Sequence, residues 1–186
     1  MNRNIAWAIA LLIAAAPQSA PAIAVPAAPQ LVDQTGRTFT LESLRGRPLV
    51  VTFISAHCTD ACPLINAQFS DAATRIAHQG LSARLLTITL DPQRDPPMVM
   101  RSLATRFGAN PRYWLLASGR PADVDAILDA YGVIARPGKS GYRENHTTFV
   151  YVFDASGKLE KTMLASTDLT NAIVDEVRTM KPGIGR

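Results

Sequence analysis

Residues 49–63 read LVVTFISAHCTDACP and join an apolar run to a pair of cysteines. The first part, Leu49 to Ile54, is apolar or β-branched throughout, which is typical of a strand buried on both faces of a sheet. A loop with both cysteines of the chain follows, and Pro63 then opens a helical pattern. This order predicts a strand-helix unit of a parallel sheet.

The same alternation continues along the chain. Apolar spacing predicts further strands over 85–90 and 113–116, and helices over 63–79, 96–107, 121–131 and 168–180. Turn residues predict hairpins within 31–44 and over 147–164, and the mixed composition of 132–145 predicts a loop. We therefore expect an α/β fold, with a central mostly parallel sheet, an antiparallel edge hairpin and helices on both faces.

Composition excludes several classes of protein. The chain has 186 residues, of which 47% are hydrophobic and 18% charged, so it is neither disordered nor a disulfide-stapled miniprotein. This length predicts one domain. The net charge of +4 comes from 19 basic and 15 acidic residues that are scattered along the chain, so no nucleic-acid groove is indicated.

The N-terminal residues have the features of a secretory signal peptide. Arg3 lies in a short basic start, residues 5–16 are apolar, and small residues surround Ala24. The rival hypothesis is an uncleaved or interfacial tether, but this apolar run spans only about 18 Å of helix against about 30 Å of hydrocarbon. We expect a signal peptide over 1–24, a flexible lead-in over 25–30, the domain over 31–186, and a periplasmic location.

Both cysteines, Cys58 and Cys62, lie in the loop after the first buried strand, where parallel sheets place ligands. We expect a tight loop with Cys62 near the N-cap of a helix that begins at Pro63. The positive end of that helix favours the thiolate form, which makes the cysteines reactive or metal-binding. A purely structural disulfide is the alternative, but closing so short a loop contributes only about 2 kcal/mol.

A histidine, His146, stands directly before the strand predicted at 147–153 and is expected at the same edge of the sheet. Two thiolates and an imidazole suit Cu(I), and they hold Cu(II) if an oxygen joins them, whereas structural zinc sites take four protein ligands. His57 is a possible fourth ligand but is expected to point away. His78 lies near a helix end, where its charge suits the dipole.

The segment 91–95 follows the second buried strand at the same edge. Asp91 either orients a ligand or caps the loop, and both interpretations stay open. Arg94 and Asp95 are expected to form a turn and a helix cap. The remaining methionines do not cluster, so a methionine copper site is not supported: Met98, Met100, Met163 and Met180.

Over residues 30–182 the chain resembles the Sco/SenC family of thioredoxin-like copper proteins. The resemblance rests on Cys-x-x-x-Cys-Pro at 58–63, Asp-Pro-x-x-Asp at 91–95, and His146 before a hairpin strand. It implies a thioredoxin-like fold, copper binding by Cys58, Cys62 and His146, and a role in building the binuclear copper site of cytochrome c oxidase subunit II. The chain departs from the family at Thr59, where members often have proline, and in its expected release from the membrane.

Related families fit less well, because thioredoxins carry Cys-x-x-Cys and peroxiredoxins a proline where this chain has Val51. The leading hypothesis is a periplasmic copper metallochaperone that releases copper when its thiols are oxidised to a disulfide. Its expected partners are subunit II or a related oxidase, together with another copper carrier or a thiol reductant. An enzymatic alternative is a thiol-disulfide oxidoreductase that uses Cys58 and Cys62 to reduce a partner copper site; a third is a domain whose disulfide only signals redox state.

Overall fold

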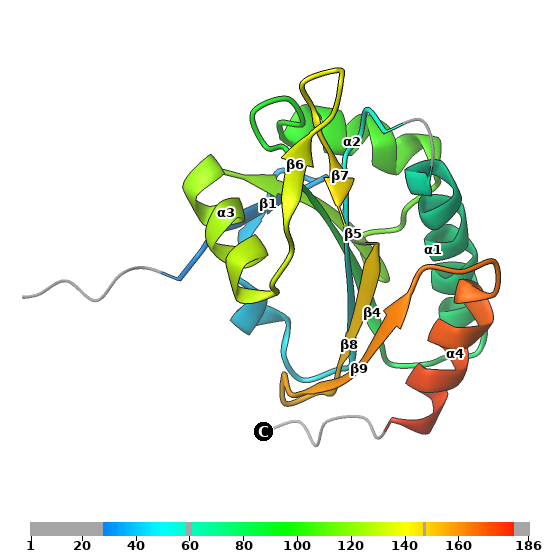
Figure 1. Ribbon diagram of the computed structural model, residues 1–186. Helices are drawn as coiled ribbons and strands as arrows, with labels where there is room; N and C mark the ends of the chain where they lie inside the picture. Colours follow the sequence, from blue (N-terminus) through cyan, green and yellow to red (C-terminus); the bar gives the residue numbers. More distant parts are fainter. Residues whose placement is uncertain (1–27, 59–60, 147, 181–186) are drawn as a thin grey trace, which may run out of the picture.

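The computed structural model of the chain describes residues 28–58, 61–146 and 148–180 (Figure 1). The expected signal peptide, most of the expected lead-in, and Thr59 and Thr147 lie outside these residues. Within the described part, no helix has both the length and the apolarity needed to cross a membrane. The predicted domain boundaries stay predictions.

A seven-stranded sheet organises the described residues. The strands follow the order β2-β1-β5-β4-β3-β8-β9 across it. Their bounds are β1 Leu31–Asp33, β2 Thr38–Phe39, β3 Leu49–Ile54, β4 Arg84–Thr89, β5 Trp114–Gly119, β8 Phe149–Phe153 and β9 Leu159–Leu164. The neighbours β3, β4 and β5 are parallel, and every other pairing in this sheet is antiparallel.

Alternation along β3 explains why this strand is apolar throughout. Leu49, Val51 and Phe53 belong to one buried cluster, and Val50 and Ile54 belong to the other, on the opposite face of the sheet. Both faces are covered, so neither set of side chains meets water. The strand therefore lies between the two buried clusters. The residues that follow it begin at the carboxyl edge of the sheet.

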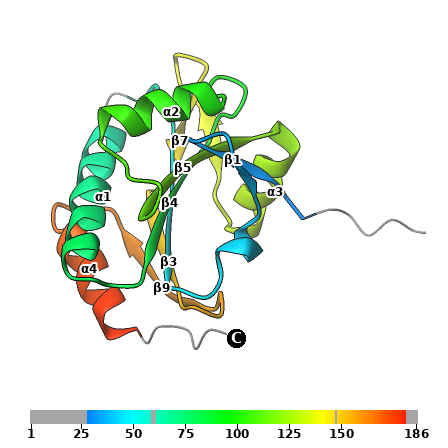
Figure 2. The ribbon, with the colours of Figure 1, turned by 180° about the vertical axis from the view of Figure 1, so that it is seen from behind.

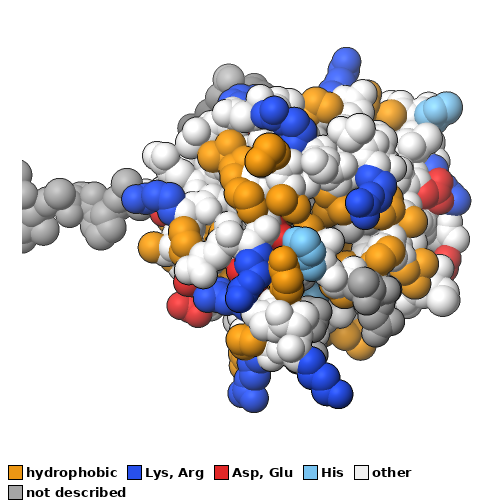
Figure 3. All heavy atoms as spheres, turned by 90° about the horizontal axis from the view of Figure 1, so that it is seen from above, with side chains coloured by type: hydrophobic (Ala, Val, Ile, Leu, Met, Phe, Trp, Pro, Cys, Tyr) orange, Lys and Arg blue, Asp and Glu red, His pale blue; other side chains and the backbone are white. Residues whose placement is uncertain are grey.

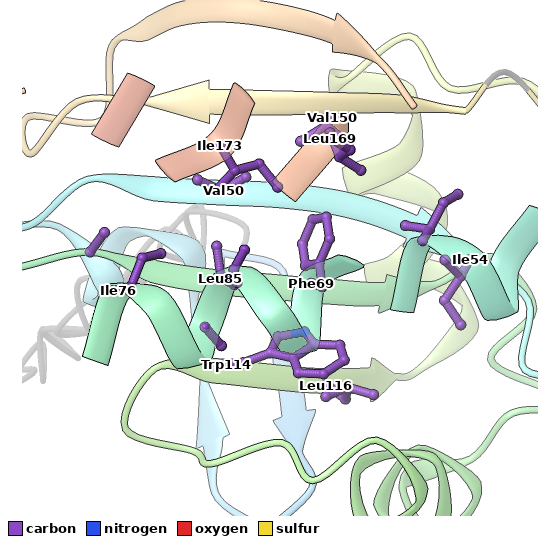
Figure 4. Close-up of a cluster of buried hydrophobic side chains, with 14 of the residues drawn as sticks. Val50, Ile54, Phe69, Ile76, Leu85, Trp114, Leu116, Val150, Leu169 and Ile173 are labelled. Carbon is purple, nitrogen blue, oxygen red and sulfur yellow. The ribbon is translucent and has the colours of Figure 1, made fainter. Parts of the chain in front are cut away.

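Helices cover the two faces unequally (Figures 1 and 2). On one face lie α1 (Ala61–His78), α2 (Pro97–Arg106) and α4 (Leu169–Thr179); on the other lie α3 (Pro121–Ala130) and the short 3-10 helix η1 (Leu41–Leu44). Phe69 of α1 packs against Trp114 of β5, with 6.1 Å between ring centroids (Figure 4). The indole N–H of Trp114 donates to the hydroxyl of Thr87, so this buried polar group is satisfied.

The predicted α/β class is confirmed, and β3 begins and ends where the sequence predicts. The parallel part of the sheet is limited to its three central strands, because the N-terminal hairpin joins the edge beside β5 in the antiparallel sense. The amide of Gln34 fixes this hairpin, since it donates to the carbonyl of Trp114 and accepts from the N–H of Leu116.

The prediction of a loop over 132–145 is wrong. This segment contains β6 (Ala135–Pro137) and β7 (Arg143–His146), which pair with each other in a separate two-stranded sheet. The hairpin lies over the carboxyl edge of the main sheet (Figure 1). Its sequence lacks apolar alternation, and contacts with segments far away in the sequence hold it in place.

Candidate metal centre

A tight turn carries the chain from β3 to the first cysteine. The N–H of Cys58 donates to the carbonyl of Ser55 at 3.2 Å, which closes the turn. The preceding N–H, that of Ala56, donates to a carboxylate oxygen of Asp95 at 2.9 Å. The loop therefore rests on a buried carboxylate contributed by another segment, the one that follows β4.

Cys62 lies near the start of α1, as expected, but the prediction that the helix starts at Pro63 is wrong. The helix begins at Ala61, so proline occupies its first turn. Proline is tolerated there because the first N–H groups of a helix have no partner within it. As a result Cys62 faces the core and is only 2% exposed, while Cys58 is half-buried.

The thiolate expected from the helix dipole is not found at Cys62. Burial, together with a hydrogen bond to Cys58, raises the pKa of the Cys62 thiol to about 12, and the hydrogen bond with the Ser55 backbone offsets only part of this. The two side chains are therefore in contact and reduced, and Cys62 is protonated at neutral pH.

Asp95 does not cap a helix, contrary to expectation. The N-cap of α2 is Pro96, which makes no side-chain cap, and Asp95 instead turns inward to accept hydrogen bonds from Ala56 and Thr89. Burial raises the pKa of Asp95, although both hydrogen bonds act in the opposite direction. Asp95 turns inward because it supplies the hydrogen-bond acceptor for the N–H of Ala56 in the cysteine loop.

His57 lies between Asp95 and the β6–β7 hairpin. Its Nε2 is 3.7 Å from Oδ1 of Asp95, and its ring lies 4.2 Å from the ring of Tyr142. The side chain is about half exposed, 46%. These contacts place the imidazole between the buried carboxylate and the hairpin, and the expectation that His57 is not a ligand stays a prediction.

His146 is the last residue of β7 and pairs with Ala135 of β6. It is half-buried and has an interaction within the protein. Since Val150 of β8 pairs with Thr52 of β3 in the antiparallel sense, the residues before Phe149 extend past the carboxyl end of β3. His146 therefore lies toward the edge of the sheet from which the cysteine loop leaves.

The three candidate ligands are not assembled as a metal site in the described residues. Across these residues, no group of three or more His, Cys, Asp and Glu side chains is close enough together to hold a metal ion. Cys58 and Cys62 are neighbours, and His146 belongs to a different small sheet near the same edge. A three-ligand site thus requires the end of β7 and the cysteine loop to approach each other.

Asp91, which the sequence left open between two roles, organises the edge of the sheet. Its carboxylate accepts from Nη1 of Arg94 at 2.9 Å and from the backbone N–H of Arg143 at 3.2 Å. Arg143 also pairs with Asp125 of α3 through its side chain. Asp91 therefore joins the loop after β4 to the β6–β7 hairpin.

The described methionines differ in burial. Met98 is exposed, whereas Met100 is buried and Met163 packs against the core. Figure 3 shows the face above the carboxyl edge of the sheet, with hydrophobic side chains spread around an exposed histidine and with basic side chains among them. Tyr142, Arg143 and Asp125 are the residues at this edge that the sequence did not reveal, because nothing in their local pattern predicts a contact.

The chain as a whole is similar to known proteins. Residues 18–181 match the SCO1/SenC family model. The chain belongs to the SCO1/SenC family. The resemblance read from the cysteine loop and its two companion motifs is thereby confirmed.

Individual relatives are distant. The SCO2-like protein of Rickettsia felis is 27% identical over 137 residues, which are 71% of this chain and 65% of that protein. The chain therefore matches slightly less than two thirds of that relative's length. ScoI of Bradyrhizobium japonicum, whose structure was determined with copper bound, is 27% identical with a TM-score of 0.71, over 85% of this chain and 100% of the other.

A third relative supports the thioredoxin-like fold. BsSco, described as a member of the Sco family of cytochrome c oxidase assembly proteins and as having a disulfide switch, superimposes with a TM-score of 0.69 at 21% identity. The superposition covers 81% of this chain and 89% of that one. At this identity the likeness concerns the fold alone.

Proposed function

We propose that this protein carries copper as cargo and delivers it to the binuclear copper site of a cytochrome c oxidase. The observation that carries the proposal is the contact between the reduced Cys58 and Cys62 side chains at the carboxyl edge of the sheet. Thiolates are the ligands that Cu(I) prefers, and a neighbouring imidazole completes a three-coordinate set. The copper-bound structure of a family member, ScoI, supports the choice of metal.

In this proposal the ligands are Cys58, Cys62 and His146. Cys62 is protonated in the metal-free protein because burial and its hydrogen bond raise its pKa to about 12. Copper binding must therefore release the Cys62 proton, which makes the affinity rise with pH. His146 joins by movement of the end of β7, a strand that belongs to a separate two-stranded sheet.

Release of the copper follows from the chemistry of the same thiols. If a disulfide of the target protein accepts two electrons from Cys58 and Cys62, the target gains two thiols and this chain gains a Cys58–Cys62 disulfide. A disulfide offers no thiolate to copper, so the metal passes to the newly reduced target. Carrier and reductant roles are thereby coupled in one exchange. The oxidase assembly role stated for BsSco and its family supports this target.

Titration of the reduced protein with Cu(I) tests the proposal. We expect about one Cu(I) per chain, and a loss of affinity of at least roughly tenfold in Cys58→Ser, Cys62→Ser and His146→Ala, because even the partners of metal ligands contribute that much. His78→Ala is the matched control, since His78 ends α1 and is not one of the proposed ligands. Equal binding by the wild type and the Cys58→Ser variant would overturn the proposal.

A second candidate is a thiol-disulfide oxidoreductase without a copper-carrying step. The unequal burial of the pair favours it, because a half-buried Cys58 beside a buried Cys62 suits attack by one thiol and resolution by the other. In that case, reduction of a disulfide substrate is lost in both cysteine variants and kept in His146→Ala. The copper proposal instead requires His146.

The place of action is part of the same proposal. The basic start, the apolar run and the small residues before Ala24 support export to the periplasm. N-terminal sequencing of the protein recovered from the periplasm of an expressing bacterium tests this. A start at Val25 is expected, and recovery from the cytoplasm at full length would contradict it.

A further inference from the structure

The position of His146 depends on how the β6–β7 hairpin docks. In the described residues this hairpin pairs only with itself and forms no strand pairing with the seven-stranded sheet. His146 is its last residue. Whatever fixes the hairpin to the edge of the sheet therefore also fixes the distance between the imidazole and the cysteines.

One aromatic contact joins the hairpin directly to the cysteine loop. The ring of Tyr142 lies 4.2 Å from the ring of His57, with an angle of 32° between the two planes. His57 immediately precedes Cys58. The guanidinium carbon of Arg94 lies 5.0 Å from the centre of the Tyr142 ring, so the tyrosine contacts residues of two different loops.

Two polar contacts hold the neighbouring residue of the hairpin. The N–H of Arg143 donates to Asp91, and the Arg143 side chain pairs with Asp125 of α3. Asp91 also holds Arg94, the residue that lies over the Tyr142 ring. These contacts anchor the hairpin to the loop after β4 and to α3, but neither of them reaches the cysteine loop.

We propose that Tyr142 is a positioning residue for the copper site, because its stack on His57 holds the His146 strand against the cysteine loop. The contact between Tyr142 and His57 is independent of the proposed function, whereas its effect on copper binding rests on that function. The aromatic ring is the active feature, so Phe retains the role and Leu loses it. Without the stack, fewer molecules hold the hairpin where the end of β7 can bring His146 to Cys58 and Cys62, and the apparent copper affinity falls with that fraction.

Hydrogen exchange of the reduced, metal-free protein tests the contact without copper. We expect amide exchange in residues 135–146 to be roughly three- to tenfold faster in Tyr142→Leu than in the wild type, because this is the range that an aromatic pair contributes. Exchange in β8 and β9 should not change. Tyr142→Phe should match the wild type. Unchanged exchange over 135–146 in the leucine variant would overturn the inference.

Tyr113→Leu is the matched control, because Arg112 lies 5.6 Å from that ring in a similar arrangement. A hairpin loosened equally by this control would mean that general destabilisation, and not the Tyr142 stack, causes the effect, and it would overturn the inference too.

Competition for Cu(I) with a colorimetric chelator tests the consequence. The leucine variant at Tyr142 should bind roughly three- to tenfold more weakly than the wild type, and Tyr142→Phe and Tyr113→Leu should stay within about twofold. Faster exchange with unchanged copper affinity would contradict a positioning role. Failure of the proposed function is distinguishable from failure of this inference, because the proposed function is tested by Cu(I) titration of the wild type and the Cys58→Ser variant alone.

Discussion

The side chain of Cys62 lies against that of Cys58, and the two cysteines differ in their access to solvent, since Cys62 is buried and Cys58 half-buried. Cys62 belongs to the first turn of α1 and is packed in the core, whereas Cys58 ends the turn that follows β3. An external reagent or partner therefore reaches the Cys58 thiol before the Cys62 thiol.

Alkylation should reveal this order. In reduced, metal-free protein at about pH 8, iodoacetamide should modify Cys58 at least roughly tenfold faster than Cys62, because burial raises the pKa of Cys62 to about 12 and the thiolate is the reactive form. Mass spectrometry of the peptides after partial labelling measures both rates. Comparable labelling of the two cysteines would contradict this assignment of burial and charge.

The cysteine loop should depend on the carboxylate oxygen of Asp95 more than on its charge. Oδ2 accepts both the Ala56 N–H and the Thr89 hydroxyl, so Asp95→Ala strands two donors and should lower the free energy of unfolding by roughly 2–5 kcal/mol. Asp95→Asn can keep the same acceptor and should lose less than about 1 kcal/mol. Urea unfolding measures both, and equal losses in the two variants would refute the role of the oxygen.

Stability at acid pH should depend in part on Asp33 in the N-terminal hairpin. Burial acts to raise its pKa, but hydrogen bonds from Thr35 and Arg37 outweigh this effect, and the pKa lies below the ordinary 3.8. A carboxylate with a lowered folded-state pKa stabilises the protein above its unfolded-state pKa, and that stabilisation disappears as the pH falls through the folded-state value. The contribution is therefore complete at neutral pH and declines below about pH 4.

Replacement of Asp33 by Asn should show this dependence. The variant should be less stable than the wild type by about 1–2 kcal/mol at pH 7, and the gap should narrow near pH 2. Asp154 makes a similar set of hydrogen bonds to Ser156 and Lys158 in an exposed turn, so Asp154→Asn is the control and should change less. A gap for Asp33→Asn that is constant with pH would show that the carboxylate charge contributes nothing.

The parts of the fold with local periodic signals could be predicted from the sequence. The strand Leu49–Ile54 is recognisable because both of its faces are apolar, and the cysteine pair is recognisable because loops after such strands carry ligands. The start of the helix near Cys62 does not follow from the sequence alone, because proline is compatible with either the first helical residue or a later position in the first turn.

The contacts between distant segments could not be predicted. The β6–β7 hairpin is held by Tyr142 on His57 and by Arg143 on Asp91, and none of these pairs has a signal within one stretch of sequence. The inward turn of Asp95 was missed for the same reason, because its partner Ala56 belongs to another loop. The residue before a helix predicts its N-cap only where no buried N–H from a distant segment binds the same side chain.

The central claim is that two sulfur atoms and one imidazole nitrogen hold the copper. X-ray absorption of the Cu(I)-loaded, reduced protein measures this ligand set directly. The account predicts two sulfur neighbours and one nitrogen neighbour for the wild type, with the nitrogen lost or replaced in His146→Ala and retained in His78→Ala. A spectrum with the same nitrogen neighbour in His146→Ala would contradict the account.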